Sequence, residues 1–248
     1  MANGSSRLEG RIALITGASR GIGAAVARRF AREGAQVILA ARTTGGLEEV
    51  DDLIRKDAAA DGRTAPPATL VPMDLANGDE IDGLAVAIAE RFGRLDVLVG
   101  NAALLGPQTP TPQIEPPDWD RMLAVNVTAN WRLIRGAEPL LRASDAGRAM
   151  FVTSGAARSA RAYRACYAVT KAALEVLVRV WAAETEKTPI RVNIVDPGGV
   201  RTEMHAEAFP GLDPMQFPPP EAVTETFVEL AETACRRHGE IVRAQKRA

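Results

Sequence analysis

The clearest chemical signal in this sequence is a tyrosine followed four residues later by a lysine. Tyr167 and Lys171 share one face if their segment is helical, because side chains at i and i+4 are neighbours on a helix. A lysine ammonium one turn away favours the phenolate and is expected to lower a tyrosine pKa that starts near ~10. Such a phenol can exchange a proton with a carbonyl or alcohol oxygen at neutral pH. Tyr163 has no lysine at i+4, and we predict that it packs or forms part of a pocket wall.

Two more polar residues could serve the same reaction. Ser154 ends an apolar run and precedes Tyr167 by thirteen residues, and its hydroxyl can donate to an oxygen that develops negative charge. Asn126 stands among apolar neighbours in a predicted helix. A polar residue within a helix can simply face solvent, but these neighbours favour burial with a hydrogen-bond partner.

Three glycines near the start of the chain predict a phosphate-binding loop. Gly17, Gly21 and Gly23 lie between an apolar run at residues 11–15 and a helical pattern at residues 22–33. Glycine permits positive φ and lets the backbone approach a pyrophosphate closely. The start of a helix adds unpaired N–H groups and the positive end of the helix dipole. This placement between a strand and a helix is much more specific than a glycine triplet alone.

Short apolar runs alternate with helical patterns along the chain. The runs that we predict as strands are residues 11–15, 36–40, 68–72, 95–99, 148–153 and 190–195, with a short seventh at 238–242. The predicted helices are residues 22–33, 47–60, 79–92, 117–141 and 167–187. This alternation predicts an open, doubly wound, mostly parallel sheet of six or seven strands with helices on both faces. We expect a single Rossmann-type α/β domain spanning residues 1–248, with a proline-rich substrate lid at about residues 201–220.

These motifs resemble those of the short-chain dehydrogenase/reductase (SDR) family. The glycine spacing G-x-x-x-G-x-G, the Y-x-x-x-K pattern and the serine thirteen residues before the tyrosine match, and the resemblance covers about residues 8–202. It implies an oxidoreductase that transfers a hydride between NADP(H) and a carbonyl or secondary alcohol, with Tyr167 as general acid/base. It also implies that Ser154 orients the substrate oxygen, that Lys171 binds the nicotinamide ribose, and that Asn126 holds a water beside the lysine. Members of this family form homodimers or homotetramers, and we expect the same here.

The residues around the glycine loop favour NADP(H) over NAD(H). In dinucleotide folds an acidic residue closing the second strand repels a 2′-phosphate, whereas here that strand leads to Arg42 and no carboxylate. Arg42 and Arg20 can both pair with a phosphate, because a guanidinium offers forked donors. The family resemblance associates a basic residue at each position with NADP. If both arginines are merely solvated, NAD(H) is the alternative cofactor.

The resemblance also assigns contacts beyond the glycine loop. Asp74 matches a position that hydrogen-bonds adenine, while an aspartate there can also serve as a helix cap. Asn101 matches a family asparagine motif from which this chain departs at Gly100 and Ala103. The complete set of predicted cofactor contacts is Gly17, Ser19, Arg20, Gly21, Ile22, Gly23, Arg42, Asp74, Leu75, Asn101, Ala102, Tyr167, Lys171, Pro197, Gly198, Val200 and Thr202.

Composition and charge exclude several other classes of protein. The 248 residues carry 30 basic and 31 acidic side chains, and a net charge of -1 does not favour nucleic-acid binding. Two cysteines and two histidines do not suffice for a disulfide framework or a metal site. No stretch is apolar for long enough to cross a membrane, and residues 1–6 lack a signal-peptide pattern. We therefore expect a cytoplasmic protein with reduced thiols and a small-molecule substrate.

Other functions fit parts of the pattern. Within the family, the sequence does not distinguish a 3-oxoacyl-thioester reductase from a reductase of small ketones, steroids or sugars. A non-catalytic dinucleotide-binding regulator could share the fold, but a regulator has no need of the set Ser154, Tyr167 and Lys171. An extended sugar-nucleotide epimerase or dehydratase needs a substrate domain, and the chain after Thr202 is too short for one.

Three arginines, Arg158, Arg161 and Arg164, lie between the candidate serine and tyrosine. They suggest an acidic or phosphate-bearing substrate, because a bound anion would offset the entropy lost in ordering them. The alternative is a solvated loop whose cations contact only water or surface carboxylates.

An apolar stripe marks the helix predicted at residues 167–187. Its members are Leu174, Leu177, Val178 and Trp181, at i, i+3, i+4 and i+7. We predict that this stripe pairs with its copy across a dimer axis. The alternative is that it meets only its own sheet.

Overall fold

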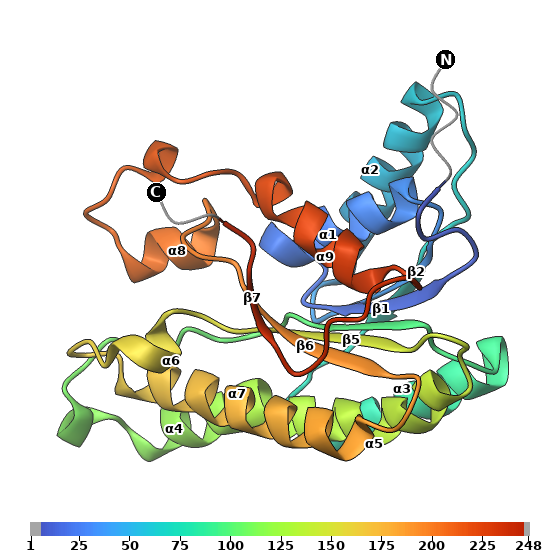
Figure 1. Cartoon of the computed structure of the whole chain (residues 1–248). Coiled ribbons are helices and arrows are strands. Elements are labelled where there is room, and N and C mark those ends of the chain that lie inside the picture. The colour runs from blue at the N-terminus through green and yellow to red at the C-terminus, as the bar shows by residue number, and fades with distance from the viewer. Residues whose placement is uncertain (1–5, 246–248) are drawn as a thin grey trace.

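Seven parallel strands form one sheet through the centre of the molecule (Figure 1). The computed structural model describes residues 6–245; residues 1–5, part of the segment in which we expected no signal peptide, lie outside that range. The strand order is β3-β2-β1-β4-β5-β6-β7, and all neighbouring pairs are parallel. The strands are β1 (Ile12–Thr16), β2 (Gln36–Ala41), β3 (Thr69–Pro72), β4 (Val97–Gly100), β5 (Arg148–Val152), β6 (Arg191–Asp196) and β7 (Ile241–Arg243). The predicted doubly wound parallel sheet is confirmed, and a seventh strand is present.

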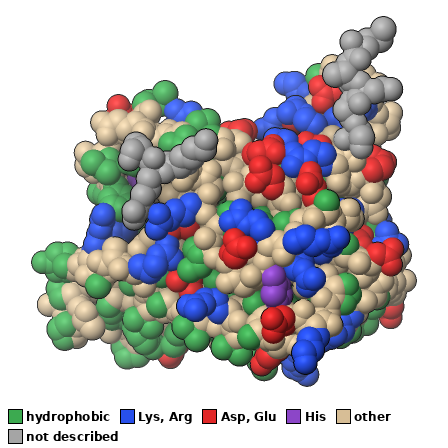
Figure 2. All heavy atoms as spheres, viewed as in Figure 1, with side chains coloured by type: hydrophobic (Ala, Val, Ile, Leu, Met, Phe, Trp, Pro, Cys, Tyr) green, Lys and Arg blue, Asp and Glu red, His purple; other side chains and the backbone are tan. Residues whose placement is uncertain are grey.

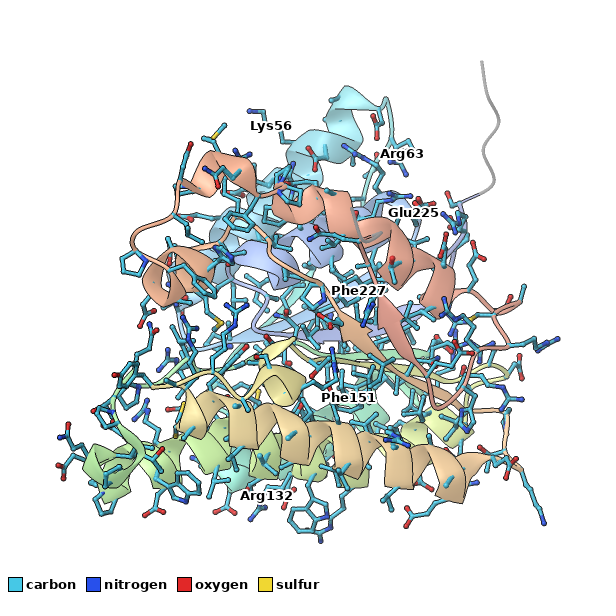
Figure 3. The ribbon with its side chains drawn as sticks, turned by 60° about the vertical axis from the view of Figure 1, so that its left-hand side comes forward. Lys56, Arg63, Arg132, Phe151, Glu225 and Phe227 are labelled. Atoms are coloured by element: carbon cyan, nitrogen blue, oxygen red, sulfur yellow. The ribbon has the colours of Figure 1, made fainter. Side chains whose placement is uncertain are left out.

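Helices cover both faces of the sheet. On one face lie α1 (Gly21–Arg32), α2 (Thr44–Ala60) and α9 (Thr224–Ala231), and on the other α3 (Gly78–Phe92), α4 (Pro116–Leu123), α5 (Ala129–Arg142) and α7 (Ala165–Thr185) (Figure 1). Each face has its own buried apolar cluster: Phe227 of α9 belongs to one and Phe151 of β5 to the other (Figure 3). Because side chains on both faces are buried, the strands are apolar at nearly every position and do not alternate with polar residues.

The helix predicted at residues 117–141 is interrupted. The observed segments are α4, a π-helical turn η2 (Ala124–Thr128), and α5. Asn126 lies in the π turn and is fully buried. A π turn widens the backbone locally and is frequent at functional sites, but periodicity alone does not reveal one.

The stripe on α7 packs inside the protein. Leu174, Val178 and Trp181 are buried in the cluster beneath the sheet, and Leu177 packs against its edge. The predicted use of this stripe in a dimer is therefore wrong: it meets its own sheet. The exposed large apolar side chains of the same layer are Val86 on α3, Trp131 on α5 and Val169, Val176 and Val180 on α7.

The surface carries charges of both signs. Acidic and basic side chains are interspersed over the face shown in Figure 2. Within residues 6–245, no helix is long and apolar enough to cross a membrane, and no three His, Cys, Asp or Glu side chains gather as a metal site. Cys166 is buried and Cys235 half-buried, both as free thiols.

The strand order reverses between β1 and β4. The chain moves from β1 outward through β2 to β3, then returns to pair β4 with the other side of β1. Loops that leave the carboxyl ends of these two strands diverge to opposite faces and open a crevice, where open α/β sheets bind ligands. The short helices α6 (Ala156–Ser159) and α8 (Glu203–Ala208) belong to loops at the same edge.

Candidate active site

A cavity of about 1430 Å³ opens at the carboxyl edge of the sheet. Its wall contains nearly every residue that the sequence singled out for cofactor binding, together with Ser154 of the candidate catalytic set. The cofactor candidates on the wall are Gly17, Ser19, Arg20, Gly21, Ile22, Arg42, Asp74, Leu75, Asn101, Ala102, Tyr167, Lys171, Pro197, Gly198, Val200 and Thr202. The two predicted residues that are absent from the wall are Gly23 and Asn126.

The glycine loop needs its glycines for two separate reasons. Gly17 and Gly21 have φ of 64° and 57°, a left-handed conformation that disfavours side chains. Gly23 has another role: a Cβ there would lie 2.2 Å from the Gly17 carbonyl oxygen. Gly23 thus permits close packing of α1 behind the loop and does not face the cavity, which corrects its predicted cofactor contact.

The start of α1 has free N–H groups. Arg20 at the N-cap makes no side-chain capping bond, and the first turn contains no acidic residue. Unpaired N–H groups and the positive end of the helix dipole therefore point out of the helix beside the loop, an arrangement that favours an anion.

Asn101 ties the end of β4 to the glycine loop. Its Nδ2 donates to the Thr16 carbonyl at 2.9 Å, and its backbone N–H donates to Thr16 Oγ1 at 3.0 Å. The departure from the family motif at Gly100 has a steric reason: a Cβ there would lie 2.4 Å from the Phe151 ring.

The charged residues near the adenine end have different surroundings. Arg42 is exposed and forms no ion pair with any described residue. Arg20 pairs with Glu203 at 2.5 Å, but both side chains are about three-quarters exposed, at 70% and 75%, so the pair contributes little to stability. Asp74 accepts from the backbone N–H of Ala76 at 3.0 Å, which leaves its second oxygen available.

Tyr167, Lys171 and Ser154 meet at the base of the cavity. Lys171 Nζ lies 5.7 Å from the centre of the Tyr167 ring and donates to the Val152 carbonyl at 2.8 Å. Burial lowers the pKa of Lys171 to about 8. Burial also raises the pKa of Tyr167 to about 12, and the Ser154 side chain opposes that rise. The direction is opposite to our expectation, because removing the phenolate from water outweighs the lysine one turn away.

Asn126 uses its side chain to join two segments. Its Oδ1 accepts from the Leu104 N–H at 2.8 Å, and its Nδ2 donates to the Leu104 carbonyl at 2.9 Å and to Thr170 Oγ1 at 3.0 Å. The expected burial with a partner is confirmed. Both Nδ2 protons are used within the protein, so this side chain supports the loop after β4 and does not donate to a water.

Arg158 has carboxylate partners that the sequence analysis missed. Its guanidinium bridges Glu175 of α7 and Asp196 at the end of β6. Thr153 Oγ1 donates to the same Glu175 oxygen at 2.7 Å. The available signal was an acidic residue four positions after Lys171 in an otherwise apolar helix. This network joins the loop after Ser154 to α7 and β6. Because its charge is already paired, Arg158 is no longer a candidate for binding an anionic substrate.

Gln245, near the end of the chain, holds the loop after β6. Its Nε2 donates to the carbonyls of Pro197 and Gly199, at 2.7 Å and 2.8 Å. No sequence pattern predicts this contact, because a single glutamine beyond the last strand belongs to no local motif. The amide fixes the backbone of the segment in which we predicted the cofactor contacts of Pro197, Gly198, Val200 and Thr202.

The segment predicted as a lid, residues 201–220, contributes His205, Phe209 and Phe217 to the cavity wall. Arg164 donates to the Ala208 carbonyl, and its guanidinium lies 4.3 Å over the Phe209 ring. His205 lies between two rings, 4.9 Å from Phe209 and 4.1 Å from Phe217. Arg164 therefore connects the start of α7 with α8.

Tyr163 does not pack as predicted. Its side chain is 59% exposed, its φ is 66°, and it is not part of the cavity wall. The loop turns outward at this residue, so the ring points away from both the core and the cavity.

Known proteins share both the sequence and the fold of this chain. The short chain dehydrogenase family model matches residues 11–213. The uncharacterized oxidoreductase YciK of Escherichia coli is 37% identical over 230 residues, which cover 93% of this chain and 89% of YciK. An uncharacterized NAD-dependent oxidoreductase of Mycobacterium tuberculosis is 31% identical, over 93% of this chain and 92% of its own. A short chain dehydrogenase from Shigella flexneri, crystallised with NADP, superposes with a TM-score of 0.91 at 34% identity, covering 98% of this chain and 100% of that one.

Proposed function

Since this chain belongs to the short-chain dehydrogenase family, we propose that it transfers a hydride between NADP(H) and a carbonyl or secondary alcohol, with Tyr167 as general acid/base. The observation that carries this proposal is the meeting of Tyr167, Ser154 and Lys171 on the wall of the cavity that also contains the glycine loop. A regulator that only binds a dinucleotide would not require these three side chains beside one another.

The cavity wall fits a nicotinamide dinucleotide. The pyrophosphate would lie against the uncapped start of α1, where Gly17 and Gly21 keep the backbone free of side chains. Asp74 would receive the adenine amino group, and Thr202 with the preceding backbone would receive the carboxamide. Lys171 would hold the nicotinamide ribose. When bound, the cofactor supplies the hydride that reduces the carbonyl carbon.

Each catalytic side chain has a role that its surroundings support. Burial keeps the Tyr167 phenol protonated at neutral pH, so its Oη can donate a proton to the carbonyl oxygen. The Ser154 hydroxyl donates a hydrogen bond to the same oxygen as negative charge develops on it. Lys171, with a pKa of about 8, is cationic at neutral pH and stabilises the phenolate that remains after the transfer. In the direction of alcohol oxidation the phenolate takes the proton back.

The preference for NADP(H) over NAD(H) rests on Arg42. It stands at the end of β2 with no ion-pair partner among the described residues, and no carboxylate closes that strand. The Shigella flexneri structure contains NADP, which supports this choice. The Mycobacterium tuberculosis relative is named NAD-dependent, so NAD(H) is the alternative that the experiment must exclude.

Self-association is part of the proposal. Trp131, Val176 and Val180 are exposed apolar side chains on α5 and α7, whereas most such side chains in this protein are buried. We expect at least a homodimer through this face. Light scattering that shows a monomer at micromolar concentration would contradict it.

Replacing the phenol tests the function directly. Tyr167→Phe removes the proton donor and should lower turnover by about 10²–10⁴-fold, the usual contribution of general acid/base catalysis. NADPH binding, followed by fluorescence, should be retained. The assay is NADPH oxidation with a panel of diketones and quinones. Tyr163→Phe is the matched control, because that ring lies outside the cavity. Near-normal turnover in folded Tyr167→Phe would overturn the assignment.

A further inference from the structure

Two arginines at the substrate end of the cavity have no acidic partner. Arg161 and Arg164 both line the cavity and follow Ser154 in the loop that leads to Tyr167. Among residues 6–245, neither forms an ion pair, whereas Arg158 in the same loop pairs with two carboxylates. The loop thus contains one arginine whose charge is neutralised by two carboxylates and two arginines without a carboxylate partner among the described residues.

The acidic residues of the cavity do not balance these charges. Asp196 is bound by Arg158, and Glu203 is bound by Arg20. The remaining carboxylates on the wall, Glu49 and Asp74, follow β2 and β3 at the adenine end. Near Tyr167 the cavity is therefore positively charged.

The neighbouring titratable groups respond to this charge. The pKa of Arg164 is lowered, first by burial and then by the charge of Arg161. The pKa of His205 is lowered, first by burial and then by the charge of Arg164. The α7 helix also begins at Ala165 without an acidic residue in its first turn, so the positive end of its dipole adds to the same field.

Most of the other side chains at the substrate end are apolar, although Arg201 and His205 also line the cavity there. Phe209, Phe217 and Leu212 come from the lid, and Leu104 and Leu105 come from the loop after β4. Rings and aliphatic side chains bury an apolar body well, but they offer no partner for a second charged group.

We infer that the carbonyl substrate has an apolar body and an anionic group that pairs with Arg164 and Arg161. The inference rests on the proposed reductase function and narrows its substrate class. Guanidinium groups bind carboxylates and phosphates through forked donors, and Arg164 is already ordered by Ala208 and Phe209, so little further entropy is lost when an anion binds. An anion beside Arg164 would lie near the reacting carbonyl, because Arg164 and Tyr167 line the same cavity and the Arg164 charge is close enough to act on the Tyr167 phenol.

A pair of substrates with the same carbonyl and apolar body, one charged and one neutral, provides the test. The probes are benzoylpropionate and its neutral methyl ester, followed by NADPH oxidation with the wild-type protein. We expect kcat/KM for the acid to exceed that for the ester by about tenfold or more, within the range of one charge-assisted contact. Raising the salt concentration should reduce this ratio, because both arginines are partly accessible to solvent.

Neutral substitutions assign the effect to residues. Arg164→Gln should raise KM for the acid about tenfold more than KM for the ester, because loss of the contacts with Ala208 and Phe209 affects both substrates alike, whereas loss of the charge affects only the acid. Arg161→Gln should act in the same direction and more weakly, because its side chain is exposed. Arg135→Gln is the matched control for net charge, since that exposed arginine lies on α5 and pairs with Asp82.

The outcomes separate this inference from the proposed function. If kcat/KM of the wild type is the same for the ester and the acid, the proposed anionic subsite is wrong and the reductase function stands. If Arg164→Gln impairs acid and ester equally, Arg164 only holds the lid. If Arg161→Gln leaves the kinetics with the acid unchanged, Arg164 alone binds the anion. If both variants leave these kinetics unchanged, the proposed anionic subsite does not exist. No NADPH oxidation with these or any other carbonyls would contradict the proposed function itself.

Discussion

The two halves of the cavity reach left-handed backbone conformations with different residues. In the cofactor half the positive φ values belong to glycines: 64° at Gly17, 57° at Gly21 and 69° at Gly198. In the loop from Ser154 to Tyr167, which borders the substrate half, they belong to Ala160 at 40° and Tyr163 at 66°, the only non-glycine residues with positive φ between residues 6 and 245, and neither of these side chains lines the cavity. Glycine adopts this conformation at no steric cost, whereas a residue with a Cβ is strained by about 1–2 kcal/mol.

The difference shows which interactions determine the backbone conformation on each side of the cavity. The cofactor half is shaped by local backbone preferences and by the carboxyl ends of β1, β2, β3, β4 and β6. The loop of the substrate half is held against its own preference by contacts with other elements, above all those of Arg158 with α7 and β6 and of Arg164 with α8. Strain of this kind persists only where the surrounding structure imposes it, and it is frequent at functional sites.

The largest effect should follow from a side chain in the cofactor half. In Gly17→Ala the new Cβ would lie 2.9 Å from Ala102 Cα, in a left-handed conformation. We expect a loss of about 2–4 kcal/mol in the free energy of unfolding and at least tenfold weaker NADPH binding. Urea denaturation and fluorescence titration measure both. Gly45→Ala is the control, because nothing lies within 4 Å of its new Cβ. If Gly17→Ala and Gly45→Ala have the same free energy of unfolding, the cofactor half does not depend on glycine at residue 17, and the contrast with the substrate half is wrong.

An intermediate effect should follow from the charge at the end of β2. Wild-type protein should bind NADPH more tightly than NADH, and Arg42→Ala should narrow that gap by about 1–3 kcal/mol. NADH binding should hardly change, because a 2′-hydroxyl carries no charge for Arg42 to neutralise. Fluorescence titration of both cofactors gives the result, and Arg20→Ala shows whether the second arginine shares the contact. Equal binding of NADPH and NADH by the wild type would show that we have misinterpreted this strand end.

The smallest effect, with the opposite sign, should come from the substrate half. Tyr163→Gly relieves a left-handed tyrosine whose ring is already 59% exposed. Part of the gain is offset by the greater freedom of glycine in the unfolded chain, so we expect stabilisation of about 0.5–1 kcal/mol. Tyr163→Ala loses the ring but keeps the strained Cβ, and it should not be stabilised. Thermal unfolding of the three proteins checks this; a gain in the alanine variant, or none in the glycine variant, would show that the loop is not strained here.

Local sequence patterns were sufficient to predict the sheet and most of the residues that line the cofactor half of the cavity. Apolar runs placed six strands within one or two residues, because strands buried on both faces must be apolar throughout. Gly17 and Asn101 were found because each follows directly on a strand, and Gly21 because it begins the helix after the first of these strands; the carboxyl ends of parallel strands meet at one edge. Tyr167 and Lys171 were found because a helix brings i and i+4 together without help from any other element.

Only the tertiary structure decided how the substrate half is built. The partners of Arg158 lie 17 and 38 residues away, and those of Gln245 lie 48 and 46 residues away, separations that no local pattern encodes. The same holds for the buried face of α7 and for the pKa of Tyr167: an apolar stripe does not say which surface will cover it, and an i+4 lysine does not say how much water the fold removes from the phenol. Burial and long-range pairing depend on all elements together, so they became visible only when the sheet, its helices and its lid were in place.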